Sequence, residues 1–277
     1  MIQRALELVN GRYLHYRFSK KANAPTLVLL HASPRNSAMF VPFIELLQDH
    51  FNIVAPDTPG YGLSEELAET PTDLYGYLPT LRAFLSQIGV DTFVLYGTAT
   101  GAQLGIAYCL TYPAHVQNLY LDNAADFSDE TRNQILEKYF LSLAPRADGS
   151  HLTDAWKMAG QAFQFFPWFE DNPAHRISQF EPSPTVQNAA VMEFLTAGQN
   201  YDLAYRYAFE HERAENVQAL RVPVVLFRWL GGILLPHTDA LIAKGLPPNI
   251  NAVEIPVLPQ ERLSKMAEVI IGASPRH

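Results

Sequence analysis

Short apolar runs alternate with longer amphipathic stretches along most of the chain, and this alternation predicts a parallel sheet covered by helices. The continuous apolar run TLVLL at 26–30 is typical of a strand that is buried on both faces. Before it, the turn signal and alternation in NGRYLHYRF predict an antiparallel hairpin within residues 1–19. Further strands are predicted at 51–55, 92–96, 117–123, 221–229 and 250–255. Helices are predicted near 40–48, 72–88, 100–112, 236–244 and 260–271.

The alternation stops between residues 124 and 217, where short strands disappear and the chain becomes helical, aromatic and rich in loops. An interruption of this size in an α/β pattern predicts an inserted helical cap domain over 124–217, with a core domain formed by 1–123 and 218–277. Four residues of this cap are candidates to line a pocket beneath it: His151, Trp156, Phe166 and Trp168. Packing inside a small helical core is the alternative for the aromatic residues, and helix capping is the alternative for the histidine.

A glycine turn joins the strand at 92–96 to the following helix in the segment VDTFVLYGTATGAQLG. The turn resembles the G-x-S-x-G elbow, in which the third position carries a nucleophile at a sharp strand-to-helix turn. Ala99 occupies that position, and a methyl group cannot attack a substrate. Thr98 and Thr100 flank the tip and could hydrogen-bond a ligand, but a threonine hydroxyl without a nearby base is a poor nucleophile.

Composition narrows the range of partners. The net charge of −8 and the lack of a basic cluster exclude a typical nucleic-acid binder. The longest apolar stretch, 222–235, is interrupted by Arg228 and is too short to span a bilayer, and MIQRALELVN lacks the apolar core of a secretory signal. The single cysteine, Cys109, permits no intrachain disulfide. We therefore expect a cytoplasmic protein that binds neither nucleic acid nor membrane, and we leave a homodimer open.

The sequence predicts no metal and no cofactor. Its histidines are scattered singly, without the paired spacing of a zinc site. The glycine-rich stretch GTATGAQLG fits neither the phosphate-loop pattern nor a complete dinucleotide-binding pattern.

Four motifs in order, HASP, PDTPGYGLSE, YGTATGAQ and VPVVLFRW, resemble the α/β-hydrolase superfamily over essentially the whole chain. The resemblance is strongest to its cap-bearing branch, near haloalkane dehalogenases, epoxide hydrolases and carbon–carbon bond hydrolases. It implies an α/β-hydrolase fold with a mostly parallel eight-stranded sheet. It also implies that backbone N–H groups near Ser33 and at Thr100 form an oxyanion hole, that His31 mainly supports the loop, and that Asp57 braces the loop PDTPGYG.

All three positions of the family's catalytic triad are altered. Ala99 replaces the nucleophile, the expected acid position falls near Ile233 or Leu234, and the expected histidine position offers Gln260 or Glu261. The only later histidine is His277. Because a triad works as a unit, one substitution made to trap a substrate would not explain three changes. We therefore interpret Ala99 as native and the triad as degenerate.

Three residues remain as candidates for proton transfer: Asp122, His237 and Glu261. Asp122 ends a strand, at the sheet edge where α/β active sites gather, and loop capping is its alternative role. His237 lies at a helix start, where capping is the simpler interpretation. Glu261 lies in the first turn of the last helix, where an acid complements the helix dipole.

Three functions are consistent with this sequence. We favour a cofactor-independent enzyme that acts without a covalent intermediate on a small, largely apolar carbonyl or ester-like molecule, in the manner of a lyase, decarboxylase, cyclase or atypical hydrolase. The second is a pseudoenzyme that binds a ligand in a pocket that has lost its chemistry. The third is a serine hydrolase with an engineered Ser→Ala nucleophile.

Overall fold

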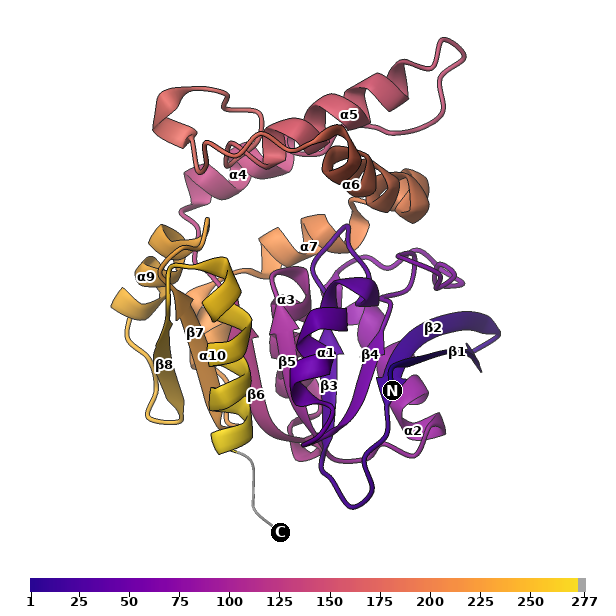
Figure 1. The fold of residues 1–277 in the computed structure, drawn as a ribbon, viewed down its shortest axis with the longest axis vertical. Coiled ribbons are helices and arrows are strands. Elements are labelled where there is room, and N and C mark those ends of the chain that lie inside the picture. The colour runs from indigo at the N-terminus through magenta and orange to yellow at the C-terminus, as the bar shows by residue number, and fades with distance from the viewer. Residues whose placement is uncertain (274–277) are drawn as a thin grey trace.

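Eight strands form one sheet in the computed structural model, which describes residues 1–273 apart from the side chains of Pro259 and Gln260 (Figure 1). The strands are β1 (Gln3–Val9), β2 (Arg12–Ser19), β3 (Thr26–Leu30), β4 (Asn52–Pro56), β5 (Phe93–Thr98), β6 (Val116–Asp122), β7 (Val224–Trp229) and β8 (Ile250–Ile255). Their order in the sheet is β1-β2-β4-β3-β5-β6-β7-β8, with antiparallel pairing of β1 with β2 and of β2 with β4 and parallel pairing elsewhere. The predicted fold class is confirmed. His277 lies outside the described residues.

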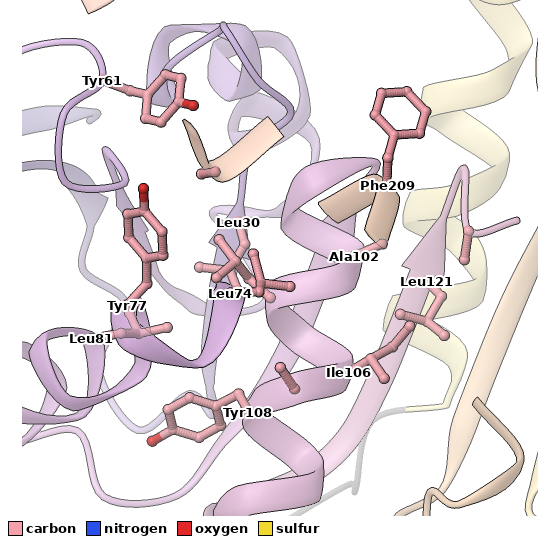
Figure 2. Close-up of a cluster of buried hydrophobic side chains, with 14 of the residues drawn as sticks. Leu30, Tyr61, Leu74, Tyr77, Leu81, Ala102, Ile106, Tyr108, Leu121 and Phe209 are labelled. Atoms are coloured by element: carbon pink, nitrogen blue, oxygen red, sulfur yellow. The ribbon is translucent and has the colours of Figure 1, made fainter. Parts of the chain in front are cut away.

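Helices cover both faces of the sheet, which explains why β3 is apolar from Leu27 to Leu30. Leu27 and Leu29 belong to a buried cluster that includes side chains of α1 (Val41–Leu47) and α10 (Pro259–Gly272). Val28 and Leu30 point to the opposite face, where a larger cluster includes side chains of α2 (Leu78–Gln87) and α3 (Thr100–Thr111). Figure 2 shows part of this larger cluster, with Ala102 and Ile106 projecting from α3. Both faces of a central strand are therefore buried, as the sequence predicts.

The helices of the core are α1 (Val41–Leu47), α2 (Leu78–Gln87), α3 (Thr100–Thr111), α9 (Leu235–Ala243) and α10 (Pro259–Gly272). Among the described residues, none of the helices is both long enough and apolar enough to cross a bilayer.

Two predicted boundaries differ from the observed ones for local reasons. The helix predicted over 72–88 begins at Leu78, because the Asp73 side chain accepts a hydrogen bond from Gly76 N–H and caps a separate 3-10 turn at Leu74–Tyr77. The strand predicted from residue 221 begins at Val224, directly after Pro223, which has no N–H to donate to a neighbouring strand.

Between β6 and β7 the chain forms helices instead of strands. These are α4 (Asp129–Lys138), α5 (Ser150–Ala162), α6 (Pro184–Ala197), α7 (Leu203–His211) and α8 (Ala214–Gln218). In Figure 1, α4, α5 and α6 form a layer above the sheet, and α7 lies between this layer and the core, packed on α3. Aromatic rings of Tyr139, Phe140, Tyr205 and Phe209 pack against one another beneath the layer.

Candidate active site

Ala99 lies at the turn between β5 and α3 in a backbone conformation that residues other than glycine rarely adopt. Its φ is 49° and its ψ is −115°. Such a conformation costs on the order of 1–3 kcal/mol and persists only where the surroundings impose it. Ala99 N–H donates to the Asp122 carbonyl at 3.0 Å, and the Ala99 carbonyl accepts from the N–H groups of Ala102 and Gln103. The chain thus keeps a strained elbow although its tip carries only a methyl group.

The glycines of the elbow allow β3, β5 and α3 to meet backbone to backbone. A Cβ atom added at Gly101 would lie 2.0 Å from the Leu30 carbonyl oxygen. One added at Gly97 would lie 2.2 Å from the Gly101 carbonyl oxygen. The turn therefore requires glycine at both positions because the neighbouring atoms are main chain and cannot move aside.

A cavity of about 310 Å³ lies at Ala99, between the ends of the central strands and the inserted helices. Its apolar wall includes Ala99, Phe166, Phe209, Ile233 and Leu234. The polar and charged side chains that line it are Ser33, Arg35, Thr98, Thr100, Asn123, Tyr139, Tyr205, Glu212 and Arg262. This cavity contains the elbow and both segments predicted to form an oxyanion hole, so it is the candidate active site.

The hydrogen-bond donors at the elbow differ from those expected. Ser33 N–H donates to the Thr100 hydroxyl at 3.3 Å, so one of the two predicted oxyanion donors already has an acceptor in the chain itself. Thr98 also lines the cavity, and its hydroxyl accepts from the Asn123 amide at 3.4 Å. A ligand oxygen at this site would meet the Thr100 hydroxyl and its backbone N–H, or would have to displace the hydroxyl from Ser33.

Asp122 lies fully buried at the end of β6 and is neutralised by a cation. Its carboxylate accepts a hydrogen bond from the Tyr96 hydroxyl at 2.9 Å and forms an ion pair with Arg262 Nη2. The Arg262 guanidinium stacks on the Trp229 ring, 4.4 Å from its centroid. Burial alone would lower the pKa of Arg262, but the charge of Asp122 and the nearby Tyr96 raise it, so the side chain stays a cation. Asp122 is therefore not the unpaired proton-transfer group that its position at a strand end predicts.

Arg262 is not a candidate from the sequence, although among the described side chains of α10 it lines the cavity. The family's histidine position at this junction predicts an acid or base, which favours Glu261, whereas an arginine cannot take up a proton. Glu261 is exposed in the first turn of α10, which matches its alternative role at a helix start. The side chain of Gln260 lies outside the described residues.

Glu212 is the second site residue that the sequence does not reveal. It lies between α7 and α8 and lines the cavity, although EHERAENV has the composition of a solvated charged segment. Burial raises the pKa of the Glu212 carboxyl well above its ordinary value of 4.5, and a hydrogen bond from the Gln103 amide at 3.3 Å offsets only part of this effect. The environment therefore favours the neutral acid, which can donate a proton or a hydrogen bond.

His211, next to Glu212, contacts the Gln103 amide through its oxygen, whereas Glu212 contacts the same amide through its nitrogen. Its Nδ1 lies 3.0 Å from Gln103 Oε1, and its Nε2 lies 3.2 Å from the Tyr75 hydroxyl. Burial lowers the pKa of His211 to about 4, so the ring is neutral at physiological pH. This arrangement makes His211 a positioning residue for the amide that contacts Glu212.

The two histidines predicted near the site do not line the cavity. His31 Nε2 accepts from Thr58 N–H at 2.8 Å, and its Nδ1 lies 3.0 Å from the Ala32 carbonyl, so the ring supports the loop as expected. His237 packs on the Phe127 ring with 4.3 Å between ring centroids, and burial lowers its pKa. The alternative interpretation of His237 as a structural residue at a helix start fits the geometry better than proton transfer.

Of the four candidates from the inserted segment, only Phe166 lines the cavity. His151 Nδ1 accepts a hydrogen bond from Arg146 N–H at the start of α5. Trp156 is 40% exposed, and Trp168 is buried with its indole N–H donating to the Tyr139 carbonyl. Trp168 therefore packs in the helical layer, whereas Trp156 is exposed and His151 binds the loop before α5. Aromatic density in the sequence does not distinguish a helical core or an exposed ring from a pocket wall.

Asp57 fixes the loop that precedes the cavity, as the sequence predicts. It is buried, and its carboxylate lies 2.8 Å from His15 Nδ1 and accepts from the N–H groups of Ser37 and Leu63. Burial alone would raise the pKa of Asp57, but these hydrogen bonds and the nearby His31 lower it from 3.8 to about 2.

Asp57→Asn is expected to reduce the free energy of unfolding by about 2–3 kcal/mol at neutral pH. A carboxyl group with a lowered folded-state pKa stabilises the fold above 3.8, and this contribution disappears as pH falls toward 2. Denaturant unfolding of the variant and the parent at neutral and acidic pH measures the difference, which should shrink in acid. Asp49→Asn, at a highly exposed carboxylate, is the control and should change stability by no more than about 0.5 kcal/mol. Equal stabilities of Asp57→Asn and the parent at neutral pH would contradict this role.

Comparisons with known proteins show which family this chain belongs to. An uncharacterized hydrolase of Saccharomyces cerevisiae is 27% identical over 124 residues, which are 45% of this chain and 43% of that protein. Haloalkane dehalogenase 2 of Mycobacterium bovis is 26% identical over 110 residues, which are 40% of this chain and 38% of that protein. The matches with these curated relatives thus span less than half of their length.

A solved structure extends the likeness to nearly the whole chain. Epoxide hydrolase A from Mycobacterium thermoresistibile superimposes with a TM-score of 0.70 at 18% identity, covering 98% of each chain. At this identity the superposition shows the fold alone. The family model for the alpha/beta hydrolase fold matches residues 25–227, from the strand before the HASP loop to β7. This chain therefore belongs to the α/β-hydrolase superfamily, with haloalkane dehalogenases and epoxide hydrolases among its neighbours.

Proposed function

We propose that this protein is an α/β-hydrolase-fold enzyme that lacks the Ser-His-Asp triad and acts without a covalent intermediate on a small, largely apolar carbonyl or ester-like compound. One observation carries the proposal: a strained elbow with a methyl group at its tip lies in the same cavity as a buried carboxylic acid, Glu212. Backbone strain of this kind clusters at active sites and ligand clamps, where the surrounding structure holds it in place.

The groups available at the cavity support proton transfer rather than nucleophilic attack. No histidine is among the described residues that line it, so neither Thr98 nor Thr100 has an imidazole to activate its hydroxyl. Glu212 can instead protonate a ligand oxygen, while the Thr100 hydroxyl and its N–H stabilise developing negative charge. A decarboxylase-like reaction needs only such groups: the C–C bond breaks, CO2 leaves, the electron pair forms an enolate, and Glu212 supplies the proton that the product gains. A lyase- or cyclase-like reaction that begins with loss of a proton would in addition need a base, which ionised Glu212 could supply. Segment 124–217 would then act as the cap that excludes water.

A second candidate is a ligand-binding protein without catalysis. The bond from Ser33 N–H to the Thr100 hydroxyl favours it, because this bond occupies a donor that an enzyme would direct at its substrate. Incubation with a pool of small ketones, esters, lactones and keto acids, followed by mass spectrometry, separates the two candidates. Consumption of a compound supports the enzyme, whereas a compound that is recovered unchanged in complex with the protein supports the binding protein.

Ala99→Ser tests the third possibility, an engineered serine hydrolase. We expect hydrolysis of p-nitrophenyl acetate by this variant to stay within about threefold of the parent, because a serine without a base gains little over water. Ala99→Gly, which changes the elbow without adding a hydroxyl, is the control. An increase of about 10³-fold or more, together with labelling by a fluorophosphonate, would show that a triad survives and would refute the proposal.

A further inference from the structure

The Arg262 guanidinium is held in one orientation at the wall of the cavity, and some of its N–H groups have no acceptor among the described residues. Stacking on Trp229 and the ion pair with Asp122 fix its plane. Only Nη2 is engaged by Asp122; within the described part of the chain, neither Nε nor Nη1 has a hydrogen-bond acceptor. A guanidinium presents several N–H groups in a planar fork that matches a carboxylate. A side chain that only neutralised Asp122 would have no need to line the cavity.

The other ionisable side chains that line the cavity decide which charge it can accept. Arg35, the other lining cation, is half exposed and pairs with Glu193 at 3.2 Å. Because the Glu212 carboxyl is neutral, the ionised side chains among the described residues that line the cavity are Arg35 and Arg262. No carboxylate among these lining residues would therefore repel an anion placed against Arg262.

We infer that the compound bound in this cavity carries a carboxylate and that Arg262 binds this group, while the apolar wall formed by Phe166 and Phe209 holds its body. This inference rests on the proposed function, in that it assigns the substrate to the class of carbonyl compounds that bear an acid. The ion pair with Asp122 and the stack on Trp229 pre-organise the fork, so little side-chain entropy is lost when the ligand binds.

Two probes of almost equal shape test the inference: phenylacetate, which carries the charge, and phenylacetamide, which does not. Isothermal titration of the parent protein should give phenylacetate an affinity about tenfold or more above that of the amide, as a charge-assisted hydrogen bond implies. Arg262→Gln should abolish this preference and leave the amide affinity within about threefold. Arg35→Gln is the matched control and should keep the preference. The inference fails if the parent shows no preference, if Arg262→Gln retains it, or if Arg35→Gln removes it.

Asp122→Asn provides a second test in which Arg262 is retained, so the result does not depend on whether the fold tolerates Arg262→Gln. Asparagine keeps an oxygen that can accept from Arg262 and so preserves the orientation of the fork, but it removes the competing negative charge. Phenylacetate should therefore bind several-fold more tightly than to the parent, whereas the amide should be unaffected. Unchanged or weaker binding of phenylacetate would overturn the inference. If phenylacetate binds through Arg262 while no carbonyl compound is consumed, the proposed function fails and the assignment of the ligand class stands. If the protein instead consumes a neutral carbonyl compound and shows no preference for phenylacetate, the proposed function stands and the assignment of the ligand class fails.

Discussion

Glu212→Gln is expected to reduce turnover of the carbonyl compound found in the pool screen by about 10²–10⁴-fold, the usual contribution of a general acid. Glutamine keeps the shape of the side chain and its contact with Gln103, but it has no acidic proton. In the parent, the rate should fall as pH rises through the raised pKa of Glu212, because the active form is the neutral acid. Steady-state rates over a range of pH measure both effects.

The same substitution should stabilise the protein in alkaline solution. Because burial raises the pKa of Glu212, the folded chain holds a proton that the unfolded chain releases above the ordinary value of 4.5. Stability therefore falls as pH rises from that point, and glutamine removes this loss, so the Tm difference should grow with pH. Glu210→Gln, at the exposed neighbouring acid of α7, should change neither rate nor Tm. A variant that loses both activity and stability would instead indicate a structural role for Glu212.

Gly101→Ala is expected to destabilise the fold by about 3 kcal/mol or more, enough that the variant unfolds or loses its elbow. The added methyl group would lie 2.0 Å from the carbonyl oxygen of Leu30, and both atoms belong to the main chain at the junction of β3, β5 and α3. Denaturant unfolding monitored by circular dichroism measures the loss.

Gly105→Ala, one turn later in α3, is the matched control for this substitution. There the added Cβ would meet the Leu119 Cδ1 atom at 3.2 Å, and that side chain can shift, so the cost should be within about 1 kcal/mol. A Gly101→Ala variant as stable as Gly105→Ala would show that the close contact at the elbow does not constrain the fold.

Features that depend on local pattern could be predicted from the sequence. TLVLL identifies a central strand because burial on both faces leaves no polar position. The glycines of GTATG identify the elbow because they permit the backbone contact with Leu30. Helix starts were less predictable, since the Asp73 cap separates a 3-10 turn from α2.

The chemistry of the site depends on contacts between distant segments, which the local pattern does not record. Glu212 lies in a charged segment and becomes buried only because α7 packs on α3 beside Gln103. Arg262 meets Asp122 across 140 residues of sequence. The sequence predicts oxyanion donors near Ser33 and at Thr100, and this stays a prediction; the bond between Ser33 N–H and the Thr100 hydroxyl depends on how the two loops face each other.

Rapid-quench mass spectrometry of the intact protein during turnover tests the central claim most directly. A compound consumed at the elbow without a nucleophile leaves the mass of the chain unchanged at every time point while product accumulates. An adduct that forms and decays at the rate of turnover would reveal a covalent intermediate and contradict the account, as would the absence of product from every acid-bearing carbonyl compound tested.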